Sequence, residues 1–238
     1  MIRRIIPNAC TSANLLFGMC SIIATFEGCL TWAAIFILLA LVADGLDGRL
    51  ARYFGVSSEL GKEMDSLCDL GSFGVAPAIL AYSFCLNKFG TLGSAAAIFF
   101  ALCGMWRLAR FNVSTDVVHG YFMGLAIPAG GCLVATSAML FSAMDLDPFD
   151  WGYVYPTFII IVAYLMISHV HYPNFKGDGA EPLYPVPKMI AIVLFAAIMY
   201  LGHTAFLSAL VTALFATYAV FGMVNSLFAM LKRDYKEM

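Results

Sequence analysis

Two short segments, DGLDGRLAR at residues 44–52 and GKEMDSLCD at residues 61–69, bring four aspartates into a chain that is otherwise strongly apolar. The aspartates of the first segment are three residues apart and those of the second are four apart, so each pair lies on one face of a helix. They are Asp44, Asp47, Asp65 and Asp69. Carboxylates inside membrane-spanning helices are costly and are functional by default. These four residues are therefore the first candidates for a functional site.

The composition of the 238-residue chain is that of a membrane protein. Hydrophobic residues make up 62% of the chain and charged residues 12%, whereas a soluble domain is about half apolar and about a quarter charged. A spanning helix needs about 20 mostly apolar residues. Candidate spans lie near residues 12–28, 30–52, 62–87, 91–111, 120–144, 152–170, 187–202 and 204–231. The sequence thus predicts an all-α, polytopic membrane helix bundle of about eight transmembrane helices.

The basic residues favour one orientation of this bundle. If the N-terminus is cytoplasmic and the spans alternate, 12 of the 13 Lys and Arg residues fall on the cytoplasmic side and only Lys88 falls outside. This asymmetry follows the positive-inside rule. It predicts an integral protein of the cytoplasmic (inner) membrane, with the acidic segments facing the cytoplasm. The net charge of −2 and the lack of a basic run argue against a nucleic-acid partner.

One extended loop divides the chain into two parts. Residues 171–187 are rich in Pro and Gly and carry several charges. We therefore expect a six-helix membrane core at residues 1–170, followed at residues 171–238 by a cytoplasmic loop and a C-terminal two-helix extension. Within the core, Pro77 is expected to kink the third span.

The two acidic segments are expected to form one metal site. A short turn joins their helices and makes them antiparallel, so the acidic faces can meet in one pocket. Close carboxylates repel one another unless a cation neutralises them, and all-oxygen ligands favour Mg²⁺ or Mn²⁺, with Ca²⁺ as an alternative. The competing interpretation is that single aspartates cap helices or pair with Arg49, Arg52 or Lys62. Four aspartates at these spacings favour the metal site, and Arg52 is suited to bind a phosphate bidentately.

The pattern of residues 44–69 resembles a known family signature. Asp-x-x-Asp-Gly-x-x-Ala-Arg is followed after eight residues by Gly-x-x-x-Asp-x-x-x-Asp, as in the CDP-alcohol phosphatidyltransferases. The resemblance implies a six-helix membrane core, a homodimer, a divalent metal held by the first three aspartates, and Asp69 as proton acceptor and further metal ligand. It also implies that Gly48, Arg52 and Ser58 contact the CDP-lipid.

Within this family the chain is most similar to the membrane-embedded phosphatidylserine synthases. The similarity covers roughly residues 5–135 and includes SFGVAPA at 72–78 and RLARFN at 107–112; Ala126 departs from it, where proline is expected. It implies transfer of a phosphatidyl group from CDP-diacylglycerol to L-serine, with release of CMP. Glycerol 3-phosphate, an inositol phosphate or choline are alternative acceptors. A cation transporter is a further alternative, although such proteins bind ions near the bilayer midplane and often contain repeats.

The acceptor alcohol needs a site of its own. Arg107, Arg110 and Asn112 lie at the end of the fourth expected span, level with the aspartates. We expect them to hold the carboxylate of serine or a phosphate. The alternative is ordinary anchoring of basic side chains at the membrane surface.

Overall fold

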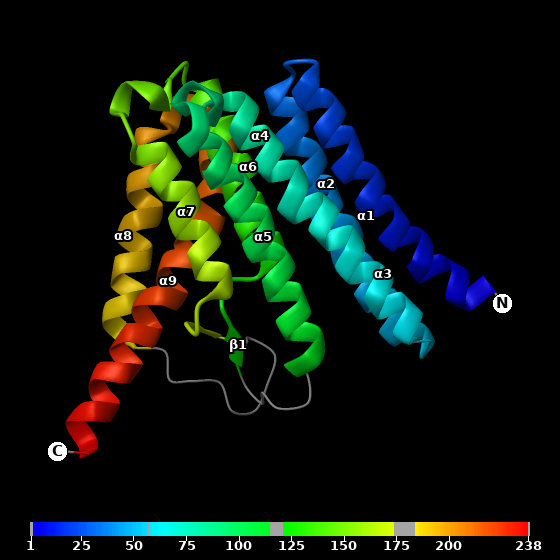
Figure 1. Ribbon diagram of the computed structural model, residues 1–238. Coiled ribbons are helices and arrows are strands. Elements are labelled where there is room, and N and C mark those ends of the chain that lie inside the picture. The colour runs from blue at the N-terminus through cyan, green and yellow to red at the C-terminus, as the bar shows by residue number, and fades with distance from the viewer. Residues whose placement is uncertain (1, 57, 115–120, 174–183, 238) are drawn as a thin grey trace.

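The protein folds as a bundle of antiparallel helices (Figure 1), seen in a computed structural model that describes residues 2–56, 58–114, 121–173 and 184–237. The α-helices are α1 (Ile2–Phe26), α2 (Leu30–Phe54), α3 (Glu59–Asp69), α4 (Ala76–Phe84), α5 (Gly90–Ser114), α6 (Ile127–Ala143), α7 (Val154–Ile167), α8 (Pro185–Leu201) and α9 (Phe206–Glu237). Shorter helical turns are η1 (Leu70–Val75), η2 (Leu86–Phe89), η3 (Pro148–Trp151) and η4 (His203–Ala205), and the two strands are β1 (Tyr121–Met123) and β2 (His171–Pro173).

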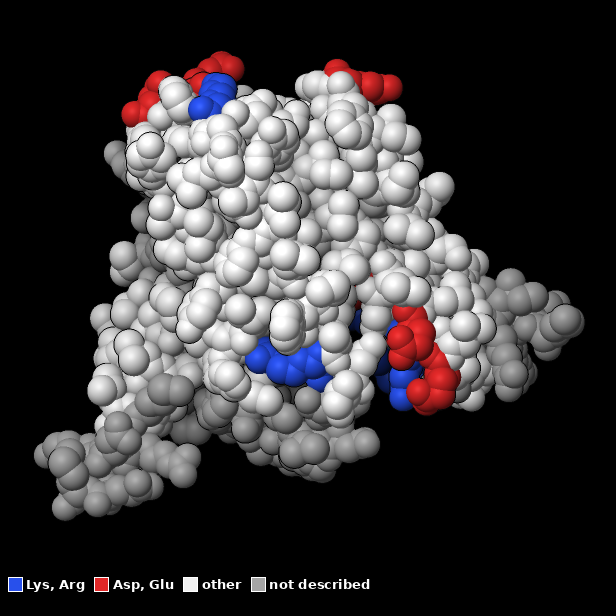
Figure 2. Space-filling model, in the orientation of Figure 1, with Lys and Arg blue, Asp and Glu red and all other residues white. Residues whose placement is uncertain are grey.

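Helix length and polarity identify an integral membrane protein. Among the described residues, five helical segments are long and apolar enough to cross a membrane: Ile6–Phe26, Leu30–Phe54, Glu59–Phe84, Leu86–Val113 and His203–Ala229. Figure 2 shows charged atoms near the upper edge and in the lower half of this face, with an uncharged belt between them. The predicted all-α membrane bundle is confirmed at this level. The count of eight spans stays a prediction, because α6, α7 and α8 are shorter apolar helices.

Two helix boundaries differ from those that the sequence predicted. The fifth span was expected from residue 120 and begins at Ile127, and the sixth was expected to reach residue 170 and ends at Ile167. These predictions are wrong because β1 pairs antiparallel with β2, with Phe122 opposite Tyr172. The small hairpin joins the lower ends of α5, α6 and α7 in Figure 1, where α-helix was expected.

The third span is interrupted beside the acidic segment. Residues 70–75 form the π-helical turn η1, in which the N–H of Ala76 donates to the carbonyl of Gly71. Pro77 follows in the first turn of α4, where a missing N–H costs no helical hydrogen bond. The interruption therefore lies in η1, just before the proline that was expected to cause it. Single π turns are frequent at functional sites.

Glycines allow neighbouring helices to approach η1 closely. A Cβ on Gly131 of α6 would lie 2.5 Å from the carbonyl oxygen of Phe73, and one on Gly18 of α1 would overlap Ser72. The Ser72 hydroxyl donates to the carbonyl of Asn14 at 2.9 Å. Contacts on both sides hold η1 between α1 and α6, and they set the position of the acidic residue that precedes it.

The C-terminal helices pack against the rest of the bundle. α8 packs on α9, and α9 packs on α6 and β2. The Thr212 hydroxyl donates to the carbonyl of Thr136 at 3.0 Å. Most of the predicted loop at residues 171–187 lies outside the described residues. The described part of the predicted extension is thus in direct contact with the predicted core.

Candidate active site

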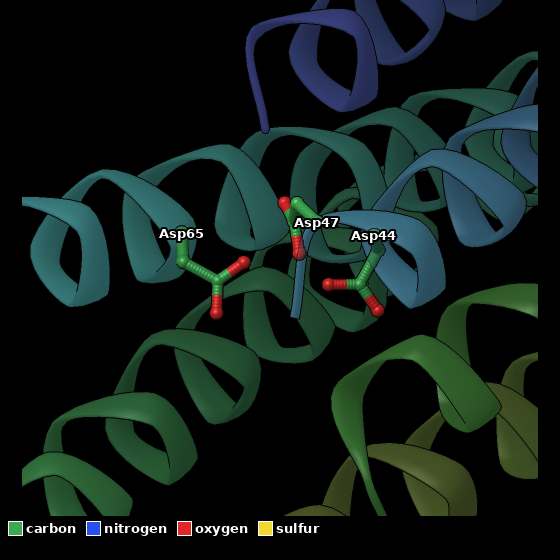
Figure 3. Close-up of side chains that lie close together, drawn as sticks. All are labelled: Asp44, Asp47 and Asp65. Carbon is green, nitrogen blue, oxygen red and sulfur yellow. The ribbon is translucent and has the colours of Figure 1, made fainter. Parts of the chain in front are cut away.

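Three carboxylates lie close together between α2 and α3, the helices that carry the two acidic segments. Asp44, Asp47 and Asp65 each offer an oxygen atom, and these atoms all lie within 4.8 Å of one another. Figure 3 shows the three side chains, from α2 and α3, turned toward a shared space. The structure thus brings together the first three of the four predicted metal-site residues.

The turn between α2 and α3 creates this arrangement. α2 ends at Gly55, which adopts the left-handed conformation (φ 62°) that glycine tolerates without steric cost. Ser58 then caps α3, its hydroxyl accepting a hydrogen bond from the Gly61 N–H at 3.1 Å. Such a cap satisfies one of the free N–H groups at a helix start. The chain therefore reverses direction within a few residues and directs the acidic face of α3 at that of α2.

The carboxylate cluster has the character of a cation site. Asp47 Oδ2 and Asp65 Oδ1 are buried and have no hydrogen-bond partner among the described residues. The ion pairs found in the described part of the chain are Lys62–Glu59 and Lys88–Asp147, so none of these aspartates forms an ion pair with a described Lys or Arg side chain. Buried charge without a partner is costly. A divalent cation bound to these oxygens would remove that cost, and the residues present fit such an ion.

Asp69 lies one turn beyond Asp65 and in a different environment. It is buried, with 7% of its surface exposed, and it accepts a hydrogen bond from Asn14 Nδ2 at 3.0 Å. It is not one of the three clustered carboxylates, but it lies close enough to Asp44 for the two carboxyl groups to interact. The fourth aspartate is therefore held individually at the edge of the cluster.

A polar groove of about 190 Å³ adjoins the cluster. It contains Asp47 and Asp65 together with Gly48, Arg52 and Ser58, the three residues predicted to contact a CDP-lipid. Pro7, Asn8 and Thr11 of α1 also line this groove. The sequence analysis assigned no role to these α1 residues or to Asn14. The signal that could have identified them is the run of polar side chains in an otherwise apolar first span.

The predicted acceptor-site residues are separated by the structure. Arg110 donates to four backbone carbonyls at the end of α7 and in β1: those of Ile167 at 2.8 Å, Ser168 at 3.2 Å, and Met166 and Met123 at 3.3 Å. The amide of Asn112 donates to the Ser66 hydroxyl at 3.0 Å. Arg110 is thus occupied in holding the small hairpin.

Arg107 alone of the three remains directed toward the aspartates. It is 8% exposed, and its charge interacts with those of Asp69 and Asp44. Its guanidinium lies 5.4 Å from the ring centroid of Phe111. A turn of helix separates Arg107 from Arg110, and this small difference places them in different environments.

Comparison with known proteins identifies the class of this protein. The sequence model of the family "CDP-alcohol phosphatidyltransferase" matches residues 4–170. The chain belongs to this family of membrane enzymes of phospholipid biosynthesis.

The relatives of this chain within the family include several enzymes whose names refer to serine. A "CDP-diacylglycerol--serine O-phosphatidyltransferase" of Helicobacter pylori is 33% identical over 227 residues, covering 95% of this chain and 92% of the relative. One of the same name from Bacillus subtilis is 35% identical over 179 residues, covering 75% and 95%. An "Archaetidylserine synthase" of Methanothermobacter thermautotrophicus is 39% identical over 179 residues, covering 74% and 72%. All three names specify a serine product.

Proposed function

We propose that this enzyme transfers the phosphatidyl group of CDP-diacylglycerol to the hydroxyl of L-serine, forming phosphatidylserine and releasing CMP. The observation that carries the proposal is the cluster of Asp44, Asp47 and Asp65 beside a groove that also contains Arg52. Acidic and basic groups together suit a metal-bound pyrophosphate. The serine enzymes named among the relatives support the choice of acceptor.

The metal of this proposal is Mg²⁺ or Mn²⁺, bound by the three clustered carboxylates with Asp69 as a further ligand. Hard divalent cations prefer carboxylate oxygen, and two buried oxygens of the cluster have no hydrogen-bond partner in the part of the chain that the structure describes. Bound there, such an ion would stabilise the negative charge that develops on the pyrophosphate as CMP leaves.

The groove residues would bind the donor lipid. Arg52 offers a planar, permanently charged fork that binds a phosphate through two N–H groups. Gly48 leaves the surface of α2 open next to it, since a Cβ there would lie no closer than 3.6 Å to Arg52. Ser58 lies at the same groove. Phosphoryl transfer depends mainly on position and electrostatics, and these residues would supply the position.

Asp69 would act as the base. The serine oxygen attacks the lipid-side phosphorus, the bond from that phosphorus to the CMP oxygen breaks, and the hydroxyl proton passes to the Asp69 carboxylate. Asn14 donates to one oxygen of this carboxylate at 3.0 Å and so fixes the orientation of the carboxyl group. Arg107, beside Asp69, would bind the serine carboxylate. We assign Arg110 and Asn112 a structural role, because both already have partners within the protein.

The orientation and assembly are part of the same proposal. Eight spans with a cytoplasmic N-terminus would place the groove at the cytoplasmic face of the inner membrane, where soluble serine is available. A homodimer is the assembly that the family resemblance implies.

The decisive experiment supplies the purified protein with CDP-diacylglycerol, Mg²⁺ or Mn²⁺, and one acceptor at a time. The acceptors are L-serine, glycerol 3-phosphate, an inositol phosphate and choline. We expect CMP release and phosphatidylserine with L-serine alone. Asp44→Asn should abolish release, whereas Asp150→Asn, the same change at an exposed position of η3, should not. Preferential use of another acceptor would overturn the serine assignment, and release by Asp44→Asn at the wild-type rate would overturn the site.

A further inference from the structure

The Arg107 side chain is buried, and its guanidinium lacks hydrogen-bond partners among the described residues. It is 8% exposed, and its buried Nε has no partner in that part of the chain. No side-chain hydrogen bond or ion pair joins it to the described residues. A buried cation in this state calls for an anion. The aspartates are in range for its charge, but they are the groups that a metal would occupy. A ligand anion is the remaining candidate.

A tyrosine from the last helix approaches the same guanidinium. Tyr218 on α9 is partly buried, and it lies close enough to Arg107 for their charges to interact. The hydroxyl of Tyr218 makes no hydrogen bond with the described residues. Tyr218 lies beyond residue 170, where the match to the family model ends. Two polar groups that have no hydrogen-bond partner among the described residues, one from α5 and one from α9, thus lie near each other.

The position of Tyr218 is held by a buried tyrosine of β2. The rings of Tyr172 and Tyr218 pack with centroids 5.4 Å apart. Tyr172 is fully buried, and its hydroxyl donates to the carbonyl of Ala219 at 3.1 Å. Gly222 makes room for it, because a Cβ there would overlap the Tyr172 ring. The hairpin that carries Tyr172 is in turn held by Arg110.

We propose that Tyr218 and Arg107 together bind the carboxylate of the amino-acid acceptor, so that α9 forms one wall of the acceptor site. The inference rests on the proposed function and deepens it. A carboxylate can accept an N–H from the guanidinium and the O–H from the phenol at once. Because Arg107 also lies within range of the Asp69 charge, an acceptor held there would have its hydroxyl near the proposed base.

The expected effect of the Tyr218 hydroxyl is on acceptor binding rather than on the chemical step. The alignment with the Bacillus subtilis relative covers 95% of that protein but 75% of this chain, so the relative is the shorter of the two. Tyr218 also lies outside residues 4–170, which match the family model. The Tyr218 hydroxyl should contribute to acceptor binding and selectivity, and little to the rate at saturating serine.

The test is Tyr218→Phe, which keeps the ring contact with Tyr172 and removes only the hydroxyl. We expect KM for L-serine to rise about tenfold, as for one lost hydrogen bond to a charged group. The kcat and the KM for CDP-diacylglycerol should stay within about twofold. The preference for L-serine over serinol, which has a hydroxymethyl group in place of the carboxylate, should fall by the same factor as serine affinity. Tyr200→Phe, at an exposed position of α8, is the matched control.

The outcomes separate this inference from the proposed function. Wild-type protein that releases no CMP with L-serine would overturn the proposed function. Wild-type protein that uses serine, with an unchanged KM in Tyr218→Phe, would overturn the inference alone. Equal losses for serine and serinol would also overturn it, because they indicate a purely structural role. Tyr218→Met is a second variant without the hydroxyl if Tyr218→Phe does not fold.

Discussion

Replacing Asp47 with Asn should stabilise the metal-free protein while it inactivates the enzyme. Asp47 is buried. One of its carboxylate oxygens lies within 4.8 Å of an oxygen of Asp44 and of an oxygen of Asp65. Two unit charges at 4.8 Å repel each other by roughly 3 kcal/mol at an effective dielectric constant of about 20. Asp47→Asn keeps the shape of the side chain and removes two such repulsions. Because solvent screens part of them, we expect a net gain of about 1–3 kcal/mol in metal-free protein.

Addition of metal should reverse the order of stability. An ion that binds only the folded protein stabilises it, by about 2.7 kcal/mol at a hundredfold excess over its Kd. Asp47→Asn lacks a ligand and should gain much less from the same ion. In excess Mg²⁺ the wild-type protein should therefore be the more stable of the two.

Thermal unfolding in one detergent, with excess chelator or excess Mg²⁺, measures both effects. For a chain of this size, 1 kcal/mol corresponds to a Tm change of about 2–4 °C. Asp150→Asn is the control, since the same chemical change at an exposed position of η3 should leave the Tm unchanged in both conditions. Equal Mg²⁺-induced shifts for wild type and Asp47→Asn would refute the metal site. If the wild-type protein had a higher Tm than Asp47→Asn in excess chelator, the argument from charge repulsion would be refuted.

Three further predictions concern other parts of the structure. Asp69→Asn should lower CMP release on the order of 10²–10⁴-fold while CDP-lipid binding remains; near-wild-type turnover would remove Asp69 from the role of base. Arg110→Gln should lower the unfolding free energy by about 1–3 kcal/mol, because buried carbonyls lose their donors; an unchanged Tm would contradict the structural role of Arg110. Hydrogen bonds from Lys88 and from the Phe149 N–H hold the pKa of Asp147 below its usual 3.8. Its stabilisation should be complete above about pH 5 and should disappear as the pH falls through the folded-state pKa. Wild-type and Asp147→Asn melting curves should therefore converge in acid, and a constant gap would disprove the assignment.

Much of the candidate site could be predicted because its determinants are local. Asp44 and Asp47 share a helix face through their spacing alone, and the Ser58 cap of the next helix involves only Gly61, three residues further on. The reversal between α2 and α3 needs only a few residues. Side chains on either side of such a turn meet whatever the rest of the bundle does.

Contacts between distant segments could not be predicted in this way. Asn14 and Asp69 are 55 residues apart, and nothing near Asn14 in the sequence indicates its partner. Arg107 and Arg110 look equivalent in the sequence, but one binds carbonyls of α7 and the other is directed toward Asp69. The pairing of β1 with β2 likewise could not be predicted, because the apolar pattern favoured helix at the start of the fifth span and at the end of the sixth.

By itself, the amino-acid sequence determined that this is a helical membrane protein with a pair of acidic helix faces, because helical periodicity and hydropathy are properties of neighbouring residues. Only the tertiary structure decided which polar groups lie beside Asp69: Asn14 from α1, and Arg107 rather than Arg110 from α5. The reason is physical. Inside a bilayer each polar group must find a partner within the protein, and which partner is in reach depends on how the helices pack.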